Sequence, residues 1–76
     1  MRLAIVEWLD SYASHGWEQE SELNYMHPSK CVSVGILRKK DDCIQITQSQ
    51  TSEKHIDHTI VIPKCAVKRI RYLRIR

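Results

Sequence analysis

Apolar and polar residues alternate most regularly in residues 30–39, where Val32, Val34 and Ile36 occupy every second position. Successive side chains of a strand point to opposite faces of a sheet, so this pattern predicts a half-buried strand. The alternation resumes in residues 43–47, after a polar stretch at residues 39–42 that is typical of a turn. The two segments together predict a β-hairpin.

Three further segments predict strands. Residues 3–12 are rich in β-branched and aromatic side chains; their apolar spacing fits a helix or a strand, and we favour a strand. Residues 58–62 predict a strand that ends at Pro63, which cannot donate to a ladder. A tight turn at residues 64–67 then leads to residues 68–76, where charged and apolar residues interleave as in a strand with one wet face.

The segments between these strands are polar. Residues 18–26 predict a helical turn or a loop before Pro28. Residues 48–57 contain mostly hydrogen-bonding side chains, which predict an exposed loop. The sequence therefore predicts one mainly all-β domain over residues 1–76, a small five-stranded barrel with at most one short helical turn.

Chain length favours self-association. A chain of 76 residues forms one domain, and a domain of this size buries only about 60% of its unfolded surface. Small cores rarely supply more than about 3–5 kcal/mol, so a partner subunit or a ligand is a reasonable expectation. We expect a homo-oligomer.

Charge is segregated along the chain. Residues 1–63 carry six basic and nine acidic side chains (net −3), whereas residues 64–76 carry six basic and no acidic ones (net +6). Guanidinium and ammonium groups bind phosphates and other anions. The candidate anion- or partner-binding residues are Lys68, Arg69, Arg71, Arg74, His55 and His58.

The geometry of a strand would place Arg69 and Arg71 on one face and Lys68 and Arg74 on the other. The simpler alternative is a solvated edge strand that its charges protect from aggregation, or one that forms salt bridges to the acidic residues of the 18–26 segment. Those acidic residues are Glu18, Glu20 and Glu22.

Enzymatic chemistry is not expected. The chain has no GxSxG, P-loop, HExxH or dinucleotide fingerprint, and only two glycines. The run His55-Ile56-Asp57-His58 with Cys65 offers zinc-ligand types, but there is no CxxC pair, so we favour exposed histidines and predict no metal and no cofactor. The odd number of cysteines, three, predicts reduced and partly buried thiols.

The two tryptophans have different contexts. Trp8 lies in an apolar segment and is expected in the core, whereas Trp17 follows Gly16 and precedes acidic residues. Exposed aromatic side chains are typical anchors of interfaces, so Trp17 is the candidate subunit or partner contact. No apolar run approaches the length of a membrane span, and charge follows the first residues too closely for a signal peptide, so we expect a cytoplasmic protein without membrane contact.

One resemblance extends over most of the chain. It is carried by Val6-Glu7-Trp8-Leu9-Asp10-Ser11, Gly16-Trp17, Val32-Ser33-Val34-Gly35, the Asp41-Asp42 hairpin, and Ile62-Pro63-Lys64 leading to Ile70. In these features the chain resembles small uncharacterised proteins of tailed phages and prophages, and in architecture it resembles Sm-like and Src-homology-type small barrels. The resemblance implies an accessory protein in the host cytoplasm that acts on a host process such as antiviral defence.

The leading hypothesis is a self-associating binding protein that inhibits or sequesters a host component, such as a host protein, or a small anionic ligand. An Sm-like module that binds single-stranded RNA is one alternative. A purely structural oligomer, in which the basic strand meets a neighbour's acidic segment, is the other.

Overall fold

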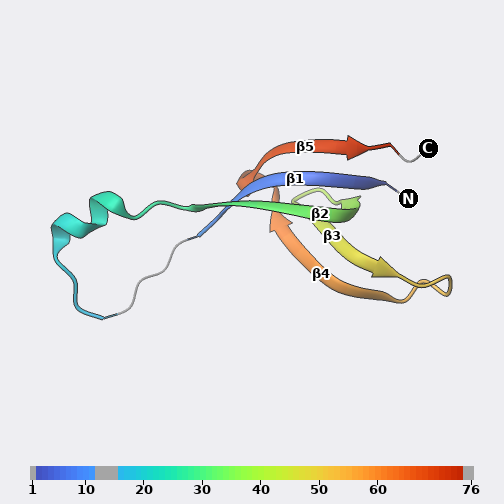
Figure 1. Cartoon of the computed structure of the whole chain (residues 1–76), viewed down its shortest axis with the longest axis horizontal. Helices are drawn as coiled ribbons and strands as arrows, with labels where there is room; N and C mark the ends of the chain where they lie inside the picture. The colour runs from blue at the N-terminus through green and yellow to red at the C-terminus, as the bar shows by residue number, and fades with distance from the viewer. Residues whose placement is uncertain (1, 12–15, 75–76) are drawn as a thin grey trace.

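Five antiparallel strands make up most of the chain in a computed structural model, which describes residues 2–11 and 16–74 (Figure 1). The strands are β1 (Leu3–Asp10), β2 (Ser29–Lys39), β3 (Cys43–Gln50), β4 (Ile56–Pro63) and β5 (Val67–Leu73). Two short 3-10 helices, η1 (Glu20–Tyr25) and η2 (Lys64–Ala66), complete the structure. The mainly β class is confirmed, with two helical turns where at most one was predicted. Tyr12, Ile75 and Arg76, the ends of two predicted strands, lie outside the described residues.

The strands form one sheet in the order β4-β3-β2-β1-β5. In the described residues this sheet is open, with β4 and β5 at its edges, so the predicted closure into a barrel is not confirmed. No helix in the described part of the chain has the length and apolar character needed to cross a membrane.

The sheet divides at Gly35. Strand β2 pairs with β1 from Ser29 to Ile36, but it pairs with β3 only from Ile36 to Lys39. A Cβ atom at Gly35 would lie 2.6 Å from the carbonyl oxygen of Thr47, so the backbone of β3 passes directly over this position. Glycine therefore permits β3 and β4 to diverge from β1 and the first half of β2 (Figure 1).

The core lies on the face where these two halves of the sheet meet. Its buried side chains come from β1 to β4, with partly buried residues of β1, η2 and β5 packed around them. The buried set is Ala4, Val6, Leu37, Ile44, Ile46 and Ile62. Trp8 packs against this cluster, as predicted, and its indole nitrogen donates a hydrogen bond to Ser33 Oγ at 3.0 Å.

Half of the predicted loop at residues 48–57 is strand. The ladder between β3 and β4 continues through Ser49↔Asp57 and Gln50↔Ile56, so only residues 51–55 connect the strands. The Thr51 N–H donates to the His55 carbonyl at 2.8 Å, and the His55 N–H donates to Thr51 Oγ1 at 3.0 Å. The predicted exposure of residues 48–57 is confirmed, but the predicted loop was too long, because polar side chains can occupy an exposed ladder without disrupting its backbone pairing.

Residues 16–28 project away from the sheet as an arm that includes η1 (Figure 1). The described chain measures 52 × 24 × 23 Å and has a radius of gyration of 16.0 Å. A compact domain of this length would have a radius of gyration of about 11 Å. The molecule is therefore elongated, and the arm exposes side chains that a compact fold would cover.

Candidate functional site

A β-bulge in β5 shapes the surface next to the arm. The ladder with β1 runs from Leu3↔Leu73 to Glu7↔Arg69 and then shifts, so that Trp8 pairs with Val67. Lys68 is thus the extra residue of β5. A bulge changes the direction of the side chains beside it, and here it lets the neighbouring Lys68 and Arg69 adjoin the same hollow.

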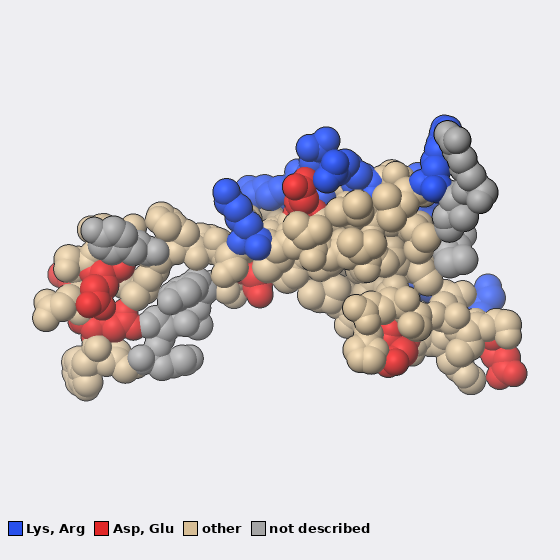
Figure 2. Space-filling view, in the orientation of Figure 1, with Lys and Arg blue, Asp and Glu red and all other residues tan. Residues whose placement is uncertain are grey.

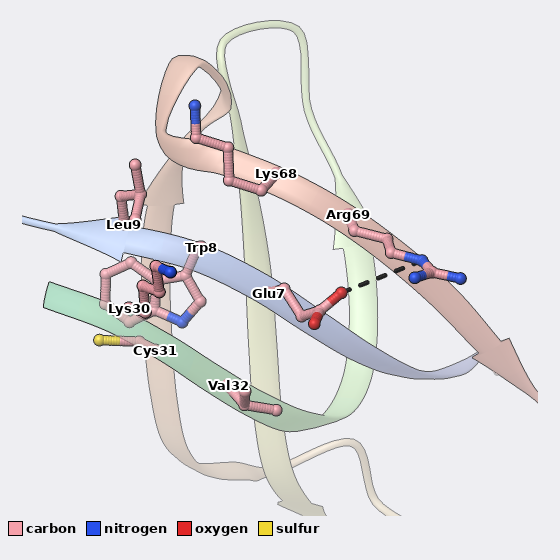
Figure 3. A pocket seen from close by; sticks show the side chains of 8 residues that line it. All are labelled: Glu7, Trp8, Leu9, Lys30, Cys31, Val32, Lys68 and Arg69. Carbon is pink, nitrogen blue, oxygen red and sulfur yellow. Dashed lines mark ion pairs between the residues drawn. The ribbon is translucent and has the colours of Figure 1, made fainter.

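That hollow is an open pocket of about 470 Å³ between β1, β2 and β5 (Figure 3). Its volume lies within the range of about 300–1,000 Å³ that is usual for ligand sites. We call it the basic pocket, and it is lined by Glu7, Trp8, Leu9, Lys30, Cys31, Val32, Lys68 and Arg69. Apolar walls with charged groups around them allow recognition of a ligand that is partly apolar and partly anionic.

The charges around the basic pocket are mostly positive. Lys30, Lys68 and Arg69 contribute +3 and Glu7 contributes −1, which leaves +2. Arg69 Nε lies 3.9 Å from Glu7 Oε2, and both side chains are substantially exposed, so this pair is weak. Lys30 and Lys68 form no ion pair within the described residues. The pocket therefore retains a net positive charge that is open to solvent.

The structure brings together only part of the predicted set. Lys68 and Arg69 line the basic pocket. Arg71 pairs with Ile5, two positions from the Arg69 pair, so Arg69 and Arg71 share a face of the sheet as predicted. Arg74 is exposed and follows the end of β5 at Leu73.

The predicted histidines lie in another part of the sheet. His55 belongs to the exposed turn between β3 and β4, and His58 lies in β4. His58 Nδ1 is 2.9 Å from Asp57 Oδ2, an exposed pair. His58 also lines a second cleft of about 470 Å³ between β2, β3 and β4, together with Ile46 and Ile60. The histidines and the β5 cations therefore do not form one site.

Lys30 was missed by the sequence reasoning. It stands at the start of β2, where it looks like an ordinary solvated residue, but the antiparallel register pairs it with Leu9. A second group of cations was missed as well: Lys39, Lys40 and Lys64 surround a hollow of about 300 Å³. In both cases the pairing of strands reveals the group of cations, because it places residues distant in sequence side by side.

The cysteines are all unpaired, and they differ in exposure. Cys31 and Cys43 are half-buried, as predicted, but Cys65 is exposed because it lies in the short η2 turn. Burial raises the pKa of the Cys43 thiol, and the charge of Asp42 and a hydrogen bond to it raise this pKa further, whereas Lys40 acts in the opposite direction. In the described part of the chain, no three potential ligand side chains gather into a metal site.

The acidic segment does not neutralise the basic strand of its own chain. Across residues 2–11 and 16–74, Glu18, Glu20 and Glu22 form no ion pair, and Arg69 pairs with Glu7 instead. The reason is geometric, because the acidic side chains gather on the projecting arm whereas the basic ones lie on the body (Figure 2). The predicted salt bridges from β5 to this segment are therefore wrong within one chain.

No protein-family model, curated protein or solved structure matches this chain.

Proposed function

We propose that this chain is a non-enzymatic binding protein that recognises an anionic group in the basic pocket. The observation that carries the proposal is that Lys30, Lys68 and Arg69, from two strands, line one pocket whose apolar walls include Leu9 and Val32. The protein would self-associate and would inhibit or sequester its target by occupancy. The resemblance to phage accessory proteins implies that this target is a host component or a small anionic ligand of the host cytoplasm.

The chemistry of the pocket supports this assignment. The guanidinium of Arg69 offers a fork of N–H donors to phosphate or carboxylate oxygens, and the two lysines add point charges that can adapt to different anions. Leu9 and Val32 can contact the apolar part of the same ligand. A phosphate or carboxylate joined to an apolar or aromatic group fits both features.

We also infer that the sheet is related to the Sm-like or Src-homology-type barrels, but that its edge strands, β4 and β5, do not pair to close it in the described chain. The short η2 link between β4 and β5, and the position of β5 beside β1, support this inference. It keeps single-stranded RNA as a second candidate ligand. Binding of RNA should weaken steeply with salt, because each phosphate contact releases counterions.

Trp8 provides a direct assay, because its side chain borders the basic pocket. In a Trp17→Phe background, Trp8 is the only tryptophan left. Its fluorescence would be followed during titrations with inorganic phosphate, adenosine monophosphate and a short single-stranded RNA. We expect saturable changes with at least one of these anions, and loss of binding in the Lys68→Glu/Arg69→Glu variant.

The matched control is Lys40→Glu/Lys54→Glu, which changes the net charge equally but at residues that do not line the basic pocket. Equal binding by the pocket variant and the control would refute the pocket assignment. Binding of RNA alone, with a steep salt dependence, would replace the small ligand with the RNA alternative.

A further inference from the structure

The projecting arm combines apolar and acidic side chains in a way that suits an interface. Trp17 is fully exposed (104%), and Leu23 is 58% exposed. Residues 16–28 carry Glu18, Glu20 and Glu22 but no Lys or Arg, a net charge of −3. We call residues 16–28 the acidic arm. A fully exposed tryptophan among charged residues is typical of an anchor that becomes buried in a complex.

The acidic arm is held away from the basic pocket of its own chain. Pairing between β1 and β2 continues through Leu9↔Lys30 to Asp10↔Ser29, so a regular ladder supports the base of the arm. Lys30 and Leu9 both line the pocket, which places the pocket beside this base, and η1 lies at the far end (Figure 1). The acidic residues of η1 therefore lie at the end of the arm that is farther from the pocket of their own chain.

We propose that the basic pocket receives the acidic arm of a second copy of this chain. This inference rests on the proposed function, because it names a partner for the same pocket. The apolar groups of the arm, Trp17 and Leu23, would cover the walls formed by Leu9 and Val32, while the glutamates face the surrounding cations. The arm carries −3 and the pocket +2, so the two surfaces are complementary in sign as well as in polarity.

A second copy is the occupant that the rest of the structure favours. Only seven apolar residues of the described chain are buried, whereas nine large apolar side chains are exposed. A core this small gains from a subunit interface. Because each copy has one arm and one pocket, two copies can exchange arms about a twofold axis and leave neither surface free.

Arm exchange would also regulate ligand binding. A small anion and the arm of the partner copy require the same cations, so they compete for one pocket. Raising the concentration of an anion that binds should release the arms and shift the dimer toward monomer. The pocket would thus be occupied in the resting protein and become available as the ligand accumulates.

Charge exchange between two variants of the full chain tests the proposal. One variant carries Glu20→Lys and Glu22→Lys in the arm, and the other carries Lys68→Glu and Arg69→Glu in the pocket. Each variant alone would oppose like charges, so we expect its dimer dissociation constant to rise at least about tenfold. In an equimolar mixture both arm-pocket contacts are again complementary, and we expect a heterodimer in native mass spectra and in light scattering.

Trp17→Ala tests the apolar half of the contact. Loss of an aromatic anchor costs about 2 kcal/mol or more, roughly 30-fold, at each contact, and the dimer has two such contacts, so we expect its dissociation constant to rise by roughly 1,000-fold. Lys40→Glu/Lys54→Glu is again the matched control and should dimerise as the unmodified chain does. Circular dichroism of each variant establishes that the sheet remains folded.

Two results would overturn arm exchange. One is a monomer of the unmodified chain at all accessible concentrations, and the other is a folded pair of charge variants that each associate like the unmodified chain. Both results are measured without the Trp8 fluorescence assay, so they do not depend on whether phosphate, nucleotide or RNA binds to the basic pocket. Retained anion binding would then leave the proposed recognition of an anion in the basic pocket standing, whereas its loss as well would refute both.

Discussion

Gly35→Ala adds one methyl group at the point where the two halves of the sheet separate. The new Cβ would lie 2.6 Å from the Thr47 carbonyl oxygen and 2.8 Å from Ile46 Cγ2. The first of these atoms belongs to backbone in the middle of a ladder, since Thr47 pairs with both Ile36 and Thr59. The clash cannot be relieved by a side-chain rotation and must displace β3.

The expected loss of stability follows from two opposing effects. Overpacking of this kind costs about 1–3 kcal/mol. Alanine also reduces the entropy of the unfolded chain, which stabilises the fold by about 0.4–1 kcal/mol. A net loss of about 1–2 kcal/mol remains, and for a domain of this length it lowers Tm by roughly 5–15 °C.

Thermal unfolding followed by far-ultraviolet circular dichroism measures this loss. Val34→Ala is the matched control, because Val34 is the adjacent residue of β2, points to the opposite face and is 53% exposed. We expect the control to change Tm by only a few degrees. A Gly35→Ala protein that melts at or above the Tm of the unmodified chain would refute the close approach of β2 and β3 at this position.

Ile62 is fully buried in the core, so Ile62→Ala should lower the free energy of unfolding by about 2–5 kcal/mol. That loss is enough to unfold much of a domain whose core supplies only about 3–5 kcal/mol. Ile62→Val should lose only about 0.5–1.5 kcal/mol and remain folded, and a denaturant titration of both variants measures the difference. The raised pKa of Cys43 lowers its thiolate fraction at a given pH, so iodoacetamide should modify the exposed Cys65 first at pH 8, as read by peptide mass mapping. Asp42→Asn removes a cause of the raised pKa and should accelerate labelling of Cys43, whereas an unchanged rate would contradict that cause.

Local alternation identified the clearest strands of this chain. Strand side chains repeat every two residues, so the alternation of Val32, Val34 and Ile36 identified β2, but Val32 and Val34 are exposed, so it did not identify the buried face. Pro63 correctly marks where β4 ends. The exposure of Trp17 followed from its glycine neighbour and the acidic residues after it. These features depend on the conformation of a few consecutive residues, which is the information that a sequence carries directly.

The pairing between strands determined which residues distant in sequence become neighbours. The extra residue Lys68 in β5, the contact of Gly35 with β3 and the proximity of Lys30 to Arg69 all depend on the register between strands far apart in sequence. Register is set by the combined packing of the core and by turn geometry, and alternation within one strand cannot report it. The sequence therefore determined the β class and the basic and acidic segments, whereas the structure alone assembled the basic pocket and held the acidic arm away from it.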